Sequence, residues 1–232
     1  MSNTPLYFLP GTLCTNDMFS EQISALKQQG INVVKVQFTV ETTIDEMVQT
    51  TLKVMGNKPG NICGFSMGGI VALALAKRHP QLITRLCLMS SNSFADLPEK
   101  EAPRKDHIKQ AKQLGLRRIF QENFLPNYLF QQNDKHNTLI TKMAESLGIE
   151  CFEAQLLALS TRECTLSVLQ SMTCPVLIIA GENDKLCNKV HQLHMHQHCP
   201  TSDLILLNNC GHFPMLERAE TVSAALGDWL LR

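Results

Sequence analysis

Gly64-Phe65-Ser66-Met67-Gly68-Gly69 decides the fold, because this stretch matches the pattern G-x-S-x-G between an apparent strand and an apparent helix. An apolar run at 61–65 precedes it and a helical pattern at 69–78 follows it. Such an abrupt change from strand to helix strains the serine backbone and crowds the residues two before and two after it, where a Cβ would clash. The positive end of the helix then points to where negative charge develops. Short motifs also arise by chance in loops, but this context favours Ser66 as a nucleophile.

Further apolar runs indicate strands on both sides of the motif, each separated from the next by a helical pattern. They cover residues 6–9, 31–38, 61–65, 85–89, 175–180 and 203–207. The runs are mostly apolar throughout, without alternation, which is typical of strands buried on both faces. We therefore predict an α/β fold with a mainly parallel sheet flanked by helices.

The region from about 96 to 173 contains no convincing strand. Helical patterns there cover 99–114, 116–124, 134–147 and 149–159. An all-helical insert between two parallel strands predicts a cap over the carboxyl edge of the sheet, where open α/β sheets bind ligands. We divide the chain into a core at 1–93 and 171–232 and a helical cap at 94–170.

A serine hydroxyl needs an adjacent base, and enzymes with the G-x-S-x-G turn carry Ser, acid and His in that chain order. Asp184 follows the run at 175–180, and His212 follows the last run. We predict that Asp184 orients the imidazole of His212, which takes the proton from Ser66.

Other residues compete for the acid and base roles by position. Glu182 lies two residues before Asp184, and Asp96 follows the run at 85–89, another place where such folds carry the acid. His79 is the main alternative base. It precedes Pro80 at a helix end, where a cation caps the last turn, so we expect a structural role for it.

Four segments together resemble the α/β-hydrolase superfamily in order and position: Leu9-Pro10-Gly11-Thr12-Leu13-Cys14, Gly64-Phe65-Ser66-Met67-Gly68-Gly69, Gly181-Glu182-Asn183-Asp184 and Gly211-His212-Phe213-Pro214. The resemblance covers essentially the whole chain. It is closest to small capped hydrolases or acyltransferases whose first strand ends in Leu-Pro-Gly; more widely studied relatives have His where this chain has Pro10. It implies an oxyanion hole formed by the N–H groups of Thr12 and Met67, with Leu13 as the alternative to Thr12.

The resemblance implies hydrolysis of a small or medium acyl carboxylic ester through an acyl-enzyme, without a metal, nucleotide or flavin. The same triad can serve a thioesterase, an enol-lactonase, a C–C bond hydrolase, an acyltransferase or a lyase, and the fold does not decide among them. A non-catalytic receptor that binds a ligand under the cap is the alternative from another class. The intact triad and the two glycines around Ser66 count against that alternative.

Composition bounds the partners and the compartment. The 232 residues carry a formal net charge of zero, which gives no reason to bind nucleic acid or an anionic membrane. No signal peptide pattern begins the chain and no apolar run is long enough to span a bilayer. The nine cysteines include no C-x-x-C pair, so we expect free thiols in a reducing cytoplasm.

Three clusters in the sequence have both a functional and an ordinary interpretation. A basic stretch could dock an acidic acyl carrier or be a solvated helix face; it contains Arg104, Lys105, Lys109, Lys112, Arg117 and Arg118 against only Asp106. On a helix, His191, His194 and His198 share one face as zinc ligands could, but we expect a surface helix without metal. Apolar cap residues could line an acyl pocket or pack the cap on the core: Phe94, Phe120, Phe124, Tyr128, Phe130, Met143 and Phe152.

Overall fold

The computed structural model describes residues 4–232 and contains a parallel sheet of six strands within that range. The strand order is β2-β1-β3-β4-β5-β6, and each neighbouring pair is parallel. The strands are β1 Leu6–Leu9, β2 Val33–Lys35, β3 Gly60–Phe65, β4 Ile83–Met89, β5 Val176–Gly181 and β6 Ser202–Leu207. β1, β3 and β5 are buried along their whole length, as their continuous apolar runs require. The prediction of an α/β fold with a mainly parallel sheet is confirmed.

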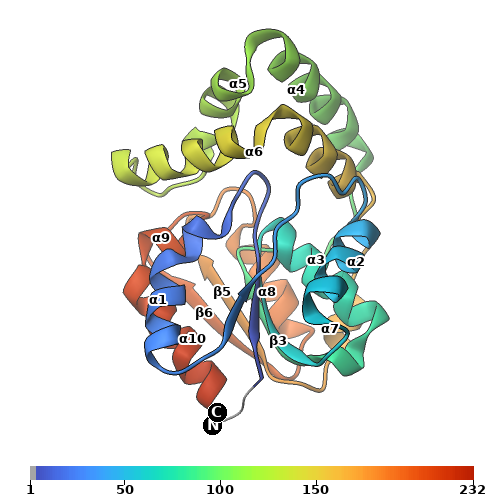
Figure 1. Cartoon of the computed structure of the whole chain (residues 1–232), viewed down its shortest axis with the longest axis vertical. Coiled ribbons are helices and arrows are strands. Elements are labelled where there is room, and N and C mark those ends of the chain that lie inside the picture. Colours follow the sequence, from blue (N-terminus) through green and yellow to red (C-terminus); the bar gives the residue numbers. More distant parts are fainter. Residues whose placement is uncertain (1–3) are drawn as a thin grey trace.

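Helices cover both faces of the sheet (Figure 1). One face carries α1 Ser20–Gln28, α9 Pro214–Glu217 and α10 Ala219–Leu231, and the other carries α2 Ile44–Met55, α3 Met67–Arg78, α7 Leu166–Ser171 and α8 Lys189–Gln197. Short 3-10 turns are η1 Asn16–Phe19, η2 Pro80–Leu82, η3 Pro98–Lys100 and η4 Leu125–Asn127. Each face has its own buried apolar core. Within residues 4–232, no helix is both long and apolar enough to cross a bilayer.

A helical insertion, residues 98–160, separates β4 from β5 and lies beyond one edge of the sheet (Figure 1). Its helices are α4 Glu101–Leu114, α5 Leu116–Asn123 and α6 Asp134–Ser160. The backbone of α6 leaves the helical region at Gly148, with φ 80°, so the two helices expected at 134–147 and 149–159 meet there. Helix α7 packs against α3 on one face of the sheet. The division into a core at 1–93 and 171–232 and a cap at 94–170 stays a proposal.

Strand β2 is shorter than the apolar run at 31–38 suggested. It is an edge strand that pairs only with β1, and the last contact is the N–H of Val36 donating to the carbonyl of Phe8. Beyond Val36 the chain leaves the sheet. The carbonyl of Phe38 instead accepts a hydrogen bond from Gln155 in the insertion, at 2.9 Å. The end of the run therefore connects the sheet to the insertion.

Candidate active site

Ser66 occupies the sharp turn between β3 and α3. Its φ of 52° lies in a region that non-glycine residues rarely adopt, at a cost of about 1–3 kcal/mol. A Cβ on Gly64 would overlap the backbone of Gly68, and one on Gly68 would overlap the carbonyl of Leu9. The predicted requirement for glycine on both sides of the serine is thus borne out. The N–H of Ser66 donates to the carbonyl of Met89 at 2.9 Å, which fixes the turn to β4.

Ser66, His212 and Asp184 come together from three separate loops. Nδ1 of His212 lies 2.8 Å from Oδ2 of Asp184, and Nε2 lies 3.1 Å from Oγ of Ser66. An ionised carboxylate only accepts hydrogen bonds, so Nδ1 carries the proton and Nε2 is free to accept from the serine hydroxyl. The arrangement can therefore transfer the proton of Ser66 to the imidazole.

Asp184 is held as a carboxylate at the end of β5. Burial alone would raise its pKa, but the imidazole of His212 and the N–H groups of Cys187 and Leu186 outweigh burial, so the net pKa is lowered. Those N–H groups donate to Oδ1 at 2.9 and 2.8 Å, which leaves Oδ2 for the imidazole. At neutral pH the carboxylate is thus both ionised and correctly turned toward His212.

The loop that carries His212 is fastened to the helical insertion. The N–H of His212 donates to the carbonyl of Tyr128 at 2.6 Å, and a Cβ on Gly211 would overlap the backbone at residues 128–130. The carboxylate of Glu217 accepts from the N–H of Gly211 at 2.9 Å and from the N–H of Phe130 at 2.7 Å. These contacts join the loop that carries His212 to residues 128–130.

The loop after β1 faces the nucleophile. Leu13 has a φ of 53°, and its N–H donates to Oε1 of Gln155 at 2.7 Å. This N–H therefore does not point to the carbon that Ser66 would attack, and the N–H of Thr12 is the candidate oxyanion donor of the loop. The hydroxyl of Thr12 contacts the sulfur of Met67 at 3.6 Å, so the two residues are neighbours. Met67 begins α3, where first-turn N–H groups have no acceptor within the helix.

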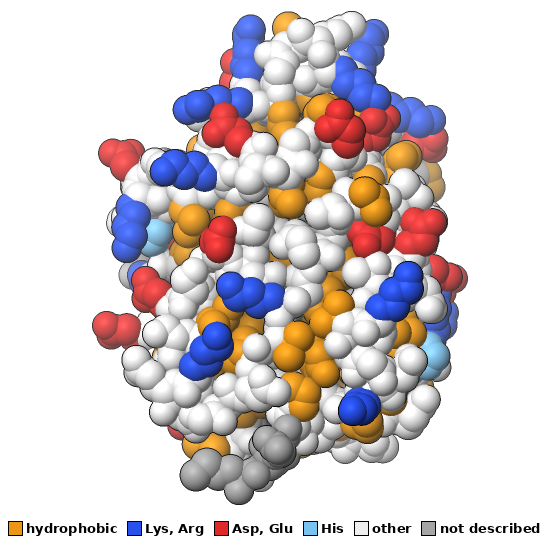
Figure 2. Space-filling view, viewed as in Figure 1, with side chains coloured by type: hydrophobic (Ala, Val, Ile, Leu, Met, Phe, Trp, Pro, Cys, Tyr) orange, Lys and Arg blue, Asp and Glu red, His pale blue; other side chains and the backbone are white. Residues whose placement is uncertain are grey.

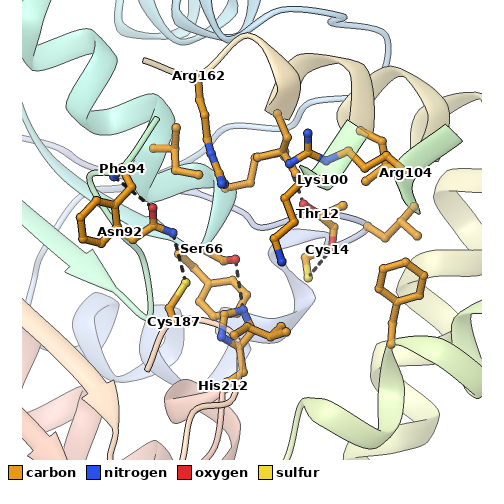
Figure 3. Close-up of a pocket in the computed structure, with 18 of the residues that line it drawn as sticks. Thr12, Cys14, Ser66, Asn92, Phe94, Lys100, Arg104, Arg162, Cys187 and His212 are labelled. Atoms are coloured by element: carbon orange, nitrogen blue, oxygen red, sulfur yellow. Dashed lines mark hydrogen bonds between the residues drawn. The ribbon is translucent and has the colours of Figure 1, made fainter. Parts of the chain in front are cut away.

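A cavity of about 850 Å³ opens onto Ser66 and His212 beneath the insertion (Figure 3). Its walls are mainly apolar. The members of the predicted aromatic set that line it are Phe94, Phe120, Phe124, Tyr128 and Phe152. Phe130 is instead partly exposed, and Met143 is buried in the core. The cavity can therefore hold an apolar acyl group next to the serine.

Three cysteines line the same cavity: Cys14, Cys187 and the exposed Cys164. Cys14 and Cys187 lack the properties of a nucleophile. Burial raises the pKa of the Cys14 thiol far above its ordinary value, and burial together with the Asp184 carboxylate raises the pKa of Cys187 to about 12. The thiolate is the reactive form of cysteine, so both side chains stay inert at neutral pH. Ser66 is the candidate nucleophile, because its hydroxyl lies 3.1 Å from Nε2 of His212.

The alternative acids, Glu182 and Asp96, and the alternative base, His79, form contacts elsewhere. Glu182 pairs with Lys189 at 2.6 Å, and Asp96 binds Arg104 and Arg162. His79 follows the last residue of α3, and its N–H donates to the helix. None of the three takes part in the hydrogen bonds that join Ser66 and His212.

The basic stretch on the insertion is largely neutralised by carboxylates that lie outside residues 104–118. Carboxylates from the same helix and from other segments pair with it: Arg104 with Asp96, Lys105 with Glu101, Lys112 with Glu153, Arg117 with Glu145, and Arg118 with Glu122. Figure 2 shows acidic and basic side chains intermingled at the insertion end of the molecule. Lys109 has no ion-pair partner in the part of the chain that the structure describes.

The histidines near α8 pack against aromatic and backbone groups. The ring of Phe94 contacts those of His191 and His194, and Nδ1 of His198 donates to the carbonyl of His194 at 2.8 Å. Across residues 4–232, no group of three His, Cys, Asp or Glu side chains is arranged to hold a metal ion. His191 also lines the cavity.

Sequence reasoning did not find several residues that shape this site. Gln155 supports the loop after β1, Glu217 supports the loop that carries His212, and Lys100, Arg162 and Asn92 line the cavity. A single polar residue in a helix or loop has no periodic signal. Only the approach of distant segments gives these side chains their positions.

The chain is similar in sequence to curated proteins that are named as hydrolases. A pimeloyl-[acyl-carrier protein] methyl ester esterase from Neisseria meningitidis is 28% identical over 189 residues, which cover 74% of this chain and 70% of the relative. The uncharacterized hydrolase YugF from Bacillus subtilis is 25% identical over 180 residues, covering 75% of this chain and 66% of the relative.

Solved structures match the fold over nearly the whole chain. A thermophilic esterase from Thermogutta terrifontis has a TM-score of 0.90 at 22% identity, with 99% of this chain and 90% of that chain covered. The enol-lactonase from Burkholderia xenovorans LB400 has a TM-score of 0.87 at 19% identity, with 100% and 93% covered. A profile of the alpha/beta hydrolase family matches residues 8–225. The predicted resemblance is therefore confirmed, and the chain belongs to the alpha/beta hydrolase family.

Proposed function

We propose that this protein is a serine hydrolase that cleaves a carboxylic ester with a small or medium acyl group. One observation carries the proposal. His212 is hydrogen-bonded to Ser66 at 3.1 Å and to Asp184 at 2.8 Å, and Ser66 and His212 line a largely apolar cavity. A nucleophile, its base and the group that orients the base are the parts that acyl transfer requires. The curated relatives named as methyl ester esterases support an ester as the bond that is cleaved.

The mechanism follows from the positions of these groups. Ser66 Oγ attacks the ester carbonyl while His212 takes its proton, and Asp184 stabilises the resulting imidazolium. The N–H groups of Met67 and Thr12 bind the oxyanion, each contributing about 3 kcal/mol to the transition state. His212 then protonates the leaving alcohol, and later activates the water that releases the acid from Ser66.

An ester presented on an acyl carrier protein is a second form of the proposal. Several relatives are named as esterases of a methyl ester linked to an acyl carrier protein, which favours this form. Among residues 4–232, the ion pairs on α4 and α5 leave Lys109 as an exposed cation of the basic stretch without a carboxylate partner. Lys109→Glu should therefore weaken turnover of a carrier-bound ester, with the free ester as the control. Unchanged turnover of both would exclude carrier docking at Lys109.

A fluorophosphonate probe tests the nucleophile. The wild-type protein should give a single adduct, located on Ser66 by mass spectrometry, and Ser66→Ala should give none. The Cys14→Ala variant is the matched control, because this thiol lines the same cavity and should not affect labelling. A folded wild-type protein that takes no label would refute the proposal and favour a receptor.

A substrate panel tests the reaction class. Aryl esters, acyl thioesters and lactones of graded chain length differ in the leaving group but share the acyl carbon that Ser66 attacks. We expect the highest kcat/KM on esters. Faster turnover of thioesters or lactones would reassign the activity while keeping the triad.

A further inference from the structure

The Lys, Arg, Asp and Glu side chains that line the active-site cavity are all basic in the described part of the chain. Lys100, Arg104 and Arg162 line it, and no Asp or Glu side chain of residues 4–232 does so. The whole chain has 21 basic and 21 acidic side chains, so this one-sided lining is not a consequence of composition. The cavity is cationic on one side within a neutral protein.

The nearest carboxylate neutralises only part of this charge. Arg104 and Arg162 share Asp96, whose side chain is only 12% exposed. Lys100 has no ion-pair partner in the part of the chain that the structure describes. Three cations against one carboxylate leave about two positive charges on this wall, next to apolar surface where charge is poorly solvated.

The three cations come from the insertion and its base, opposite the sheet. Lys100 ends η3, Arg104 belongs to α4, and Arg162 follows α6. Figure 3 shows the Lys100 side chain extending into the cavity on the side of Thr12 and Ser66. An ester whose carbonyl lies at Ser66 would thus hold its far end within reach of the cationic wall.

We propose that the preferred ester carries a second, ionised acidic group remote from the scissile bond, bound by Lys100 together with Arg104 and Arg162. This inference rests on the proposed ester hydrolysis. A carboxylate or a phosphate has the shared chemistry: oxygen acceptors that form charge-assisted hydrogen bonds with lysine and arginine. The aromatic wall formed by Phe120, Phe124 and neighbouring rings would hold the apolar part of the molecule.

A matched set of substrates tests this proposal. The mono-p-nitrophenyl ester of glutarate carries a free carboxylate, its methyl-capped analogue is neutral, and a phosphonate analogue carries the other anion. The wild-type protein should have at least a tenfold higher kcat/KM on an anionic ester than on the neutral one. The better of the two anionic esters identifies which anion the wall prefers. The preference should shrink as salt is added, because ions screen partly exposed charges.

Variants at Lys100 separate recognition from catalysis. Lys100→Met should lower kcat/KM on the anionic ester about tenfold and leave the neutral ester within twofold, while Lys100→Arg should keep the preference. Lys142→Met is the matched control, because Lys142 is an exposed lysine of α6 in the insertion and lies outside the cavity lining. It should change neither rate.

The outcomes distinguish two failures. Equal kcat/KM for anionic and neutral esters in the wild-type protein, with both hydrolysed, would overturn the anion site alone. The anion site alone would also be overturned if the wild-type protein prefers the anionic ester and Lys100→Met keeps that preference. No turnover of any ester, combined with no fluorophosphonate adduct on Ser66, would overturn the proposed function and this inference with it.

Discussion

Gln155→Leu should reduce both stability and activity, because Gln155 joins the insertion to the loop after β1. This loop carries the proposed oxyanion donor Thr12. Leucine fills the space but leaves the Leu13 N–H without an acceptor, which costs about 1–3 kcal/mol for a buried group. The Phe38 carbonyl loses its 2.9 Å partner but keeps weaker contacts with Gln37 and Cys151, so its share is about 1 kcal/mol. We expect a total loss of about 2–4 kcal/mol in the free energy of unfolding, measured in urea.

The effect on activity follows from backbone strain at the same residue. Leu13 is held at a φ of 53°, which costs about 1–3 kcal/mol, and Gln155 is the side chain that anchors its N–H. Without the anchor the loop relaxes and moves the N–H of Thr12. Losing one oxyanion donor lowers kcat about 10²–10³-fold, so we expect kcat on p-nitrophenyl butyrate to fall at least tenfold.

Gln22→Leu is the matched control. Gln22 is equally buried, and its side chain donates to the carbonyls of Met215 and Ala219, so it joins α1 to α9 and α10 instead of binding the Leu13 N–H. It should lose comparable stability and keep its kcat. The reasoning is refuted if the Gln155→Leu protein, assayed where it is fully folded, turns over the ester as fast as the Gln22→Leu protein.

Three further predictions concern the sharp turn at Ser66 and the acid Asp184. Gly68→Ala should lose about 3 kcal/mol or more, seen in thermal unfolding, because the new Cβ overlaps the backbone carbonyl of Leu9, which cannot yield as a side chain would; a wild-type midpoint would contradict this. Asp184→Asn should lower kcat about 10⁴-fold with a small change in melting temperature, since it favours the wrong tautomer of His212; a kcat within tenfold of wild type would remove Asp184 from the mechanism. Because folding lowers the pKa of Asp184, its carboxylate stabilises the fold at pH values above the unfolded pKa of about 3.9. This stabilisation is lost as the pH falls through the pKa of the folded state. Acid titration of the unfolding free energy should therefore be less steep below about pH 4 for Asp184→Asn than for wild type.

The sequence was most informative where local geometry is decisive. Ser66 could be located because a strand, a turn and a helix must meet there, and only glycine fits beside them. Gly148 marked the break between two helical patterns, and the structure has a positive φ at that residue. The ends of the buried strands likewise placed Asp184 and His212, because parallel strands deliver their carboxyl ends to one edge.

Long-range contacts account for what the sequence could not supply. The carboxylates that pair with Lys112 and Arg117 lie on α6, so the basic stretch looked unpaired along the chain. The edge position of β2 ended that strand early, although its apolar run continues. Gln155 gave no signal of its own, because its role depends on the meeting of α6 with the loop after β1.

The hydrogen bond from the His212 backbone to Tyr128 limits how freely lids can be exchanged between relatives by protein engineering. Replacing the insertion with that of a relative also removes two backbone groups. These are the Tyr128 carbonyl that accepts from the His212 N–H and the Phe130 N–H that donates to Glu217. A chimaera that replaces 98–123 and retains 124–133 keeps both contacts. The junction for domain shuffling in this protein therefore lies after α5, inside the insertion.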